Sequence, residues 1–210
     1  MSGGLRQPTK GSSAARRALA HSSRMEAFLV SLVLVAAGEI GDKTQLLALL
    51  LAARFRHRSA IVLGILVATL ANHTLAGLLG AWLRNLVPTE WLRWLIAASF
   101  IAMALWALKS DRLEERRHQD GGPWKVFAVT ATTFFMVEMG DKTQLATVAL
   151  AAQFANLPAV IAGTTMGMLV ADVPVVWLGR AIAAKISLRG ARFVAAALFV
   201  ALALVALLAR

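Results

Sequence analysis

The chain lacks cysteine and tyrosine altogether, and charged residues make up only 16 % of its 210 positions. Without cysteine there are no disulfides, no thiolate metal sites and no redox chemistry through thiols. So low a charged fraction, beside 59 % hydrophobic residues and a mean hydropathy of +0.68, excludes an ordinary soluble domain. The sequence also lacks a phosphate-cradling glycine loop, a nucleophile elbow and a metalloprotease helix motif. The composition is that of a membrane protein, with room for about six or seven spans of roughly 20 residues.

Acidic residues are scarce: 11 Asp and Glu stand against 22 Lys and Arg, which gives a formal net charge of +11. Such a balance can indicate nucleic-acid binding. Here, however, the basic residues fall in short loops between apolar segments, which is the positive-inside pattern of membrane proteins. We therefore expect a lipid bilayer as the surrounding medium and no nucleic-acid partner.

Six apolar segments follow a polar, basic tail, and we expect each segment to form a transmembrane helix. The tail, residues 1–24, should be disordered because it is rich in small and polar residues. The predicted fold is thus an all-α integral membrane protein. The six segments run over about residues 26–53, 60–83, 91–108, 126–154, 159–184 and 193–209.

A six-residue string, Glu-x-Gly-Asp-Lys-Thr, occurs twice, at residues 39–44 and 138–143, inside the first and fourth segments. The 18-residue stretches that begin at Gly38 and Val137 share 11 positions at a fixed offset of 99. The same offset relates further glycines in the later segments, such as those at 64 and 163. These matches indicate that the chain contains an internal duplication.

The duplication divides the chain into two three-helix repeats, residues 25–109 and 125–210, joined by a charged loop at 110–124. Because three is odd, the second repeat must enter the membrane in the opposite orientation. Six transmembrane helices arranged as two inverted three-helix repeats are found in many secondary transporters.

Lysine and arginine counts predict the orientation of these helices. Twelve basic residues fall on one side, in the loops after the first, third and fifth segments, whereas the other side receives three besides the tail. The twelve-residue side, with loop 110–124, should be cytoplasmic and both termini outside, in what we expect to be a bacterial inner membrane. An exported basic tail opposes this orientation, so we expect Met25 to be the true initiator.

Both motifs place charges near the centres of predicted spans, where each charge costs about 2.5–3.5 kcal/mol. Glu39 and Asp42, three residues apart, should lie on one helix face, and Lys43 should pair with Glu39 one turn away. The second copy repeats this arrangement. The expected cation ligands are Glu39, Asp42, Glu138 and Asp141, with Thr44, Gln45, Thr143 and Gln144 as supporting ligands and Lys43 and Lys142 as balancing charges.

The donors in both motifs are carboxylate, hydroxyl and amide oxygens. Oxygen sites suit hard divalent cations such as Mn²⁺, Ca²⁺ or Mg²⁺, and Cu⁺ or Zn²⁺ fits them less well. In an inverted repeat the two motif helices cross at the midplane, which would bring four carboxylates together. The alternative is that each Glu–Lys pair neutralises itself and joins helices, but this leaves the aspartate of each copy unexplained.

Two more polar residues occupy equivalent places within predicted spans, His73 in the second and Asp172 in the fifth. They can act as a proton relay beside the motifs, because intramembrane ionisable residues are usually functional. The alternative is structural. In it, Pro174, which follows Asp172 closely, kinks the helix, and His73 and Asp172 form a hydrogen-bonded polar pair.

The doubled motif resembles the signature of the Gdt family, over about residues 25–209. That family includes the Golgi manganese/calcium transporter, its chloroplast-envelope relatives and bacterial manganese exporters. The resemblance implies six helices in two inverted repeats and export of Mn²⁺ or Ca²⁺ in exchange for protons, with no cofactor and no enzymatic activity. Its acidic motif residues fall on Glu39, Asp42, Glu138 and Asp141. It also implies a chain that begins near the first span, at Met25.

Two other functions fit the sequence less well. An intramembrane aspartyl protease uses one Gly-x-Gly-Asp and one Tyr-Asp, whereas here a glutamate replaces the first glycine and tyrosine is absent. A protease dyad also needs one protonated carboxyl group, which neighbouring lysines oppose. An exporter of another small solute leaves the concentrated acidic site unexplained. A passive channel is a further alternative, but charge pairs at the midplane suit occlusion better than flow. The oligomeric state is not encoded in any motif.

Overall fold

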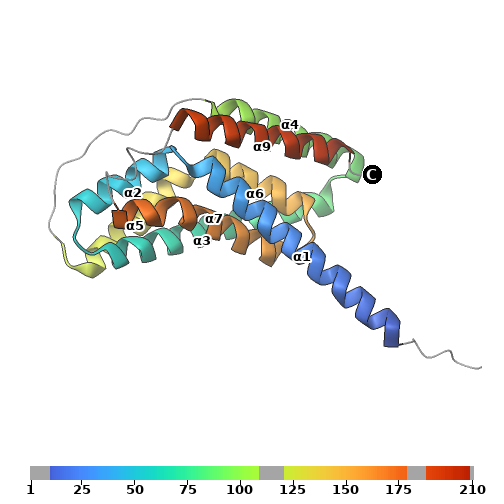
Figure 1. Ribbon diagram of the computed structural model, residues 1–210, viewed down its shortest axis with the longest axis horizontal. Coiled ribbons are helices and arrows are strands. Elements are labelled where there is room, and N and C mark those ends of the chain that lie inside the picture. Colours follow the sequence, from blue (N-terminus) through green and yellow to red (C-terminus); the bar gives the residue numbers. More distant parts are fainter. Residues whose placement is uncertain (1–9, 109–120, 179–187, 209–210) are drawn as a thin grey trace, which may run out of the picture.

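The computed structural model describes residues 10–108, 121–178 and 188–208, and the helices in these ranges pack as one bundle (Figure 1). The start of α1 projects from this bundle. Because α1 begins at Lys10, residues 10–24 of the tail are helical, where the sequence led us to expect disorder. In chain order the helices are α1 (Lys10–Glu39), α2 (Lys43–Arg54), α3 (Arg58–Leu86), α4 (Thr89–Ala107), α5 (Pro123–Glu138), α6 (Lys142–Gln153), α7 (Leu157–Leu178) and α9 (Leu188–Leu208).

Within the described residues, the three helices α3, α4 and α7 are long and apolar enough to cross a membrane. They match the second, third and fifth predicted segments. The apolar stretch Phe193–Leu208 of α9 is shorter and matches the sixth. Large apolar side chains such as Leu75, Leu105 and Val170 are exposed on these helices, as expected of surfaces that face lipid. The all-α membrane class is therefore confirmed, whereas the number of six spans stays a prediction.

The first and fourth predicted segments are not continuous helices, and that part of the prediction is wrong. α1 ends at Glu39 and α2 begins at Lys43, while α5 ends at Glu138 and α6 begins at Lys142. Each break contains a glycine with a positive φ, 83° at Gly41 and 75° at Gly140. Residues with a Cβ rarely adopt this conformation, so the glycine of each motif makes the break possible. The two motifs are therefore turns between half-length helices.

Several sequence predictions fall on residues outside the described ranges. These include most of the charged loop, residues 109–120, the end of the fifth segment, residues 179–184, and residues 1–9 of the tail. Most of the twelve basic residues used to predict the orientation lie in these ranges or carry side chains that are not described. The orientation of the helices stays a prediction.

The principal helix contacts join the first half of the chain to the second. α1 packs along α7, and α3 packs along α5 and α6. Glycines permit the close approach: Gly64 on α3 faces Thr130 on α5, and Gly163 on α7 faces Ser31 on α1. Thr130 and Ser31 are themselves 99 residues apart, as are the two glycines. The offset found in the sequence therefore relates contacts as well as residues.

The helices α4 and α9 lie side by side along one edge of the bundle (Figure 1). Their interface is apolar and buries Phe100 and Phe199, whose ring centroids are 6.3 Å apart. This pair also contacts α6 and α1. It covers one side of the motif helices with apolar surface.

The crossing of α1 and α7 supplies a first test of the fold. A Cβ at Gly167 would lie 2.6 Å from the backbone oxygen of Leu32 and 3.0 Å from the backbone nitrogen of Ala36, neither of which can move alone. We expect Gly167→Ala to separate the two helices and destabilise the protein by about 1–3 kcal/mol. The measurement is the apparent Tm in detergent.

Gly38→Ala is the matched control for this substitution. Gly38 is also buried and helical, but a Cβ there would find its nearest neighbour at an ordinary 3.5 Å. Both substitutions bring the same gain in helix propensity. Equal thermal stability of the two variants would contradict close packing at the crossing of α1 and α7.

Candidate cation site

The first motif closes its turn with its own side chains. The backbone N–H of Asp42 donates to the carbonyl of Glu39 over 3.0 Å, and that of Gly41 donates to Oε1 of Gln45 over 2.9 Å. The hydroxyl group of Thr44 donates to Oε2 of Glu39. Backbone groups freed by a break in a helix need such partners when water is excluded. Thr44 and Gln45 thus hold the turn between α1 and α2.

The second motif repeats this set of bonds. Asp141 donates its N–H to the carbonyl of Glu138 over 3.1 Å, and Gly140 donates its N–H to Oε1 of Gln144 over 2.6 Å. The hydroxyl of Thr143 donates to Oε1 of Glu138 and lies 3.5 Å from Oδ2 of Asp141. Identical residues therefore build the same turn twice.

The helix ends determine which acidic group is stable without a cation. Asp42 and Asp141 are the N-cap residues of α2 and α6, where the positive end of the helix dipole favours a carboxylate. Glu39 and Glu138 are the last residues of α1 and α5, where the dipole is negative and disfavours one. A positive charge placed beside the glutamates would be favoured by both the carboxylates and the helix ends.

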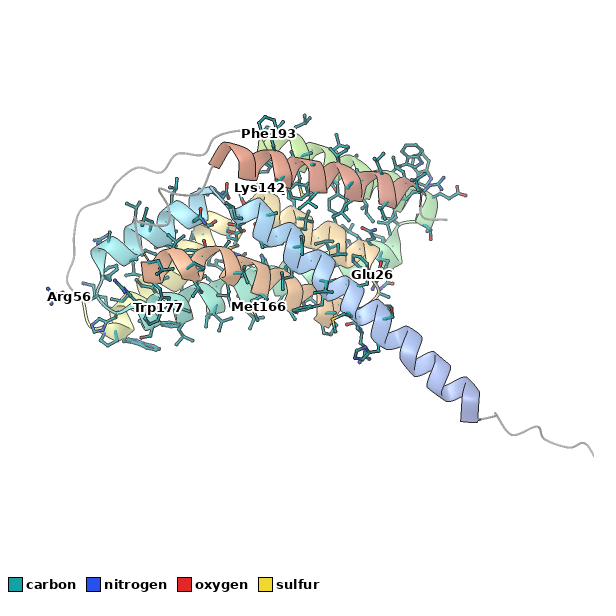
Figure 2. The ribbon with its side chains drawn as sticks, viewed as in Figure 1. Glu26, Arg56, Lys142, Met166, Trp177 and Phe193 are labelled. Carbon is teal, nitrogen blue, oxygen red and sulfur yellow. The ribbon has the colours of Figure 1, made fainter. Side chains whose placement is uncertain are left out.

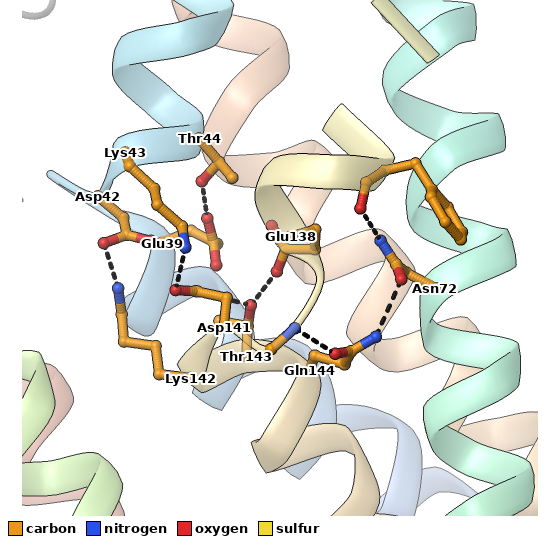
Figure 3. Close-up of polar contacts among 12 residues, drawn as sticks. Glu39, Asp42, Lys43, Thr44, Asn72, Glu138, Asp141, Lys142, Thr143 and Gln144 are labelled. Atoms are coloured by element: carbon orange, nitrogen blue, oxygen red, sulfur yellow. Dashed lines mark hydrogen bonds and ion pairs between the residues drawn. The ribbon is translucent and has the colours of Figure 1, made fainter. Parts of the chain in front are cut away.

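Crossed ion pairs join the two motifs (Figure 3). Nζ of Lys43 lies 2.7 Å from Oδ1 of Asp141, and Nζ of Lys142 pairs with Oδ1 of Asp42. The predicted pairing of Lys43 with Glu39 within one helix is therefore wrong. It assumed an unbroken helix, whereas the turn at Gly41 redirects Lys43 toward the other motif. Each lysine balances the aspartate of the opposite copy.

Carboxylate oxygens from Glu39, Glu138 and Asp141 lie within 4.8 Å of one another, a spacing that one metal ion could bridge. All three residues are at most 1 % exposed. Oε1 of Glu39 and Oε2 of Glu138 have no hydrogen-bond partner among the described residues, since each glutamate bonds its threonine through the other oxygen. The fourth predicted ligand, Asp42, is buried nearby and paired with Lys142 rather than being part of this group.

The two motif glutamines use both ends of their side-chain amides. Their oxygens accept hydrogen bonds from the N–H groups of the motif glycines. In this conformation the glutamines therefore hold the turns and do not supply cation ligands beside the carboxylates. Nε2 of Gln45 donates to the carbonyl of Ala171 on α7 over 3.2 Å. Nε2 of Gln144 donates to Oδ1 of Asn72 on α3 over 2.9 Å. Each turn is thereby tied to a helix of the other half.

Asn72 is a polar residue of the site that the sequence analysis overlooked. It is fully buried, and its Nδ2 donates to the carbonyl of Phe135 on α5 over 3.0 Å while its oxygen accepts from Gln144 (Figure 3). It occupies the position equivalent to Ala171, at the offset of 99. An asparagine next to His73 in an apolar segment was the signal that could have identified it.

His73 and Asp172 are both fully buried, on α3 and α7. Neither belongs to the group of three carboxylates that could share an ion. Both ring nitrogens of His73 and both oxygens of Asp172 have no hydrogen-bond partner among the described residues. The hydrogen-bonded pair considered from the sequence is therefore absent from this part of the chain. Asp172 follows Ala171, the partner of Gln45, and so lies on α7 beside the first motif.

The fold and the site define an integral membrane protein with a buried, duplicated acidic centre. A family model, that of the divalent cation/proton antiporter GDT1, matches residues 27–115 and 126–210. The chain belongs to this family, which confirms the resemblance noted from the two motifs. It is therefore a transporter of the cation/proton antiporter class and not an enzyme.

Individual relatives agree with this assignment. A protein of Vibrio cholerae serotype O1 named "Putative manganese exporter" is 47 % identical over 182 residues, which cover 86 % of this chain and 90 % of the relative. A GDT1-like protein of Synechocystis is 29 % identical over 86 % of this chain and 96 % of its own length. GDT1-like protein 5 of Arabidopsis thaliana is 26 % identical over 80 % and 89 %. No solved structure matches.

The bonds of Asn72 generate a second prediction. Asn72→Leu removes the partner of Gln144 and that of the Phe135 carbonyl, and leaving a buried polar group unpaired costs about 1–3 kcal/mol. We expect a lower apparent Tm in detergent. Asn85→Leu on the same helix is the control, because Asn85 is exposed. If the two variants are equally stable, Asn72 does not hold the second turn.

Proposed function

We propose that this protein exports Mn²⁺ in exchange for protons through the two-motif site. The observation that carries the proposal is the group of three buried carboxylates, from Glu39, Glu138 and Asp141, whose oxygens lie within 4.8 Å of one another. The two glutamates come from different halves of the chain and each retains an oxygen without a hydrogen-bond partner among the described residues. Carboxylate and hydroxyl oxygens are the ligands that hard divalent cations prefer.

Mn²⁺ is favoured over Ca²⁺ by the relative from Vibrio cholerae, which carries the name of a manganese exporter and is 47 % identical to this chain. Both ions accept oxygen ligands, so the residues of the motifs do not separate them. Export of another small solute has no comparable support, because nothing in a neutral solute requires four buried carboxylates.

The transmembrane arrangement that we propose has six spans in two inverted repeats. In it, α1 with α2 and α5 with α6 form two discontinuous spans, each broken at a motif, and α3, α4, α7 and α9 form the other four. Two features support it. The contact of Gly64 with Thr130 has its equivalent in the contact of Gly163 with Ser31, and broken helices surround the substrate sites of many inverted-repeat transporters. Loop 110–124 then faces the cytoplasm and both termini face outward, in a bacterial plasma membrane.

The charges of the site suggest an electroneutral exchange. Four motif carboxylates and two lysines carry a formal charge of −2, which either one Mn²⁺ or two protons would neutralise. An empty site of this charge is expensive to enclose in a medium of low dielectric constant. Only the two loaded forms should therefore switch readily between the two sides of the membrane, which is the condition for obligatory exchange.

Asp172 and His73 are the candidate proton relay beside this site. Both are buried at equivalent positions of α7 and α3, and neither side chain makes a hydrogen bond to another described residue. If Asp172 is ionised in the same cavity, it adds a negative charge that a further proton or a positive His73 must balance. Asp172→Asn should therefore alter coupling to the pH gradient more than the affinity for Mn²⁺.

The third prediction tests the ligands. The wild-type protein, expressed in a manganese-exporter-deficient bacterium, should rescue growth in excess Mn²⁺. We expect this rescue to be lost in each of four variants, because each removes an anionic oxygen from the site: Glu39→Gln, Asp42→Asn, Glu138→Gln and Asp141→Asn. The controls are Glu26→Gln and Glu90→Gln, since both residues are exposed. Expression in the membrane must be equal. Full rescue by any of the four variants would exclude that residue as a ligand, and rescue in excess Ca²⁺ but not Mn²⁺ would change the proposed substrate.

The fourth prediction concerns stoichiometry. In liposomes with a clamped membrane potential, we expect Mn²⁺ flux that is driven by a pH gradient and whose reversal point does not shift with voltage, because both loaded sites are neutral. The measurement is the Mn²⁺ gradient at zero net flux for several voltages and pH differences. A strong voltage dependence, or indifference to pH, would rule out the exchange of one Mn²⁺ for two protons.

A further inference from the structure

A basic cavity lies at the end of the molecule where α2 meets α3. Its volume is about 980 Å³, and it is lined by residues 52–58 together with Gly121 and Gly122. Within five positions this lining contains Arg54, Arg56, His57 and Arg58. The floor is apolar, because Phe55 is buried and stands under the guanidinium group of Arg54 at 5.3 Å.

The second repeat contains the same turn without the charges. Residues 153–157 are equivalent to 54–58 at the offset of 99 and contain no basic residue. In both turns the phenylalanine donates its backbone N–H to the carbonyl four residues earlier, over 2.8 Å. The arginines are thus not required to form the turn. Positive-inside topology accounts for basic residues in a loop, but not for their lining a cavity.

Arg54 and Arg58 are positioned for an anionic ligand. Nε of Arg54 is buried and has no hydrogen-bond partner among the described residues. Nη1 of Arg58 donates to the backbone carbonyl of Trp177 over 3.1 Å, which fixes this side chain and leaves its other donors for a ligand. The planar guanidinium group is the side chain best suited to bind a phosphate through two parallel bonds.

The position of the cavity identifies the source of the phosphate. Arg56 and Trp177 lie at the same end of the bundle, and the exposed Trp124 follows Gly122 closely in the chain (Figure 2). Exposed tryptophans mark the level of lipid headgroups. None of the residues that line the cavity is acidic. Basic pockets between helices at this level bind anionic headgroups.

We propose that the cavity binds the phosphate headgroup of an anionic phospholipid, held by the guanidinium groups of Arg54 and Arg58. The ligand is a structural lipid of the bilayer leaflet that this end of the bundle faces. The proposal is independent of the cation site, because none of the residues of the two motifs lines the cavity.

Native mass spectrometry of the full-length protein in detergent tests the proposal. We expect saturable binding of phosphatidylglycerol and at least tenfold weaker binding of phosphatidylcholine with the same acyl chains. A difference of about tenfold is what the loss of one charge-assisted hydrogen bond would cause. Arg54→Gln combined with Arg58→Gln should weaken phosphatidylglycerol binding by about tenfold or more. Equal binding of the two lipids, or no effect of the double variant, would overturn the proposal.

The matched control is Arg84→Gln combined with Arg93→Gln. Arg84 also donates to a backbone carbonyl, and Nε of Arg93 is also buried without a hydrogen-bond partner among the described residues. Arg84 is in the last turn of α3 and Arg93 is in the following helix α4, so both lie far along the chain from the turn that lines the cavity. This pair should leave lipid binding unchanged, and an equal loss in it would mean attraction by net charge alone. Inorganic phosphate should not displace phosphatidylglycerol at equal concentration, and displacement would make free phosphate the ligand.

A conservative double variant distinguishes loss of the guanidinium groups from misfolding of the Arg54→Gln, Arg58→Gln variant. Arg54→Lys combined with Arg58→Lys keeps both charges but removes the planar fork. It should bind phosphatidylglycerol several-fold more weakly than the wild type and still prefer it to phosphatidylcholine. Unchanged affinity in this variant would overturn recognition by the guanidinium groups.

Discussion

The crossed ion pairs at the centre of the bundle are the interaction on which the arrangement of the two halves depends. Lys43 pairs with Asp141, and Lys142 pairs with Asp42, in surroundings where an unpaired charge is prohibitive. Because each lysine reaches the aspartate of the other copy, neither half can bury its motif by itself. Removing one partner of a buried pair typically costs about 3–5 kcal/mol. The duplication is therefore also a folding constraint, since the two motifs are stable only when they face each other.

Helix breaks are what make this crossing possible. In a continuous helix, Lys43 would lie one turn from Glu39 and the charges of each copy would pair locally. The positive φ values of Gly41 and Gly140 end one helix and start another, so that the acidic residues divide between a C-terminus and an N-terminus. At each break the glutamine that follows accepts from the N–H of the glycine, the carbonyl of the glutamate accepts from the N–H of the aspartate, and the threonine hydroxyl donates to the glutamate side chain. The apolar helices α4 and α9 pack against one side of the motif helices. Broken helices in membrane proteins persist only with such partners.

The sequence predicted the apolar helices α3, α4 and α7 and the approach of three of the four motif carboxylates, because periodicity and duplication are local or countable features. It did not predict the breaks, although the signal was present: glycine followed by aspartate is the usual pairing of a helix end with an N-cap. The apolar residues on both sides of each motif suggested one continuous transmembrane helix instead. The crossed pairing of the lysines depends on tertiary geometry that spacing within one helix cannot provide. Asn72 escaped notice for a similar reason, since its partner Gln144 is 72 residues away.

The two acidic residues of each motif have different physical roles, although both are carboxylic acids three residues apart in the same motif. Asp42 and Asp141 sit at helix N-termini and are balanced by lysines. Glu39 and Glu138 sit at helix C-termini, are bonded to threonine hydroxyls, and form no ion pair with a described residue. The uncompensated charge of the site is then that of the two glutamates. These are the groups that the helix dipoles make least stable as bare anions, and hence the groups whose energy changes most when a cation or protons arrive. A site built this way responds to its ligand through the glutamates, while the aspartate–lysine pairs hold the two halves in register.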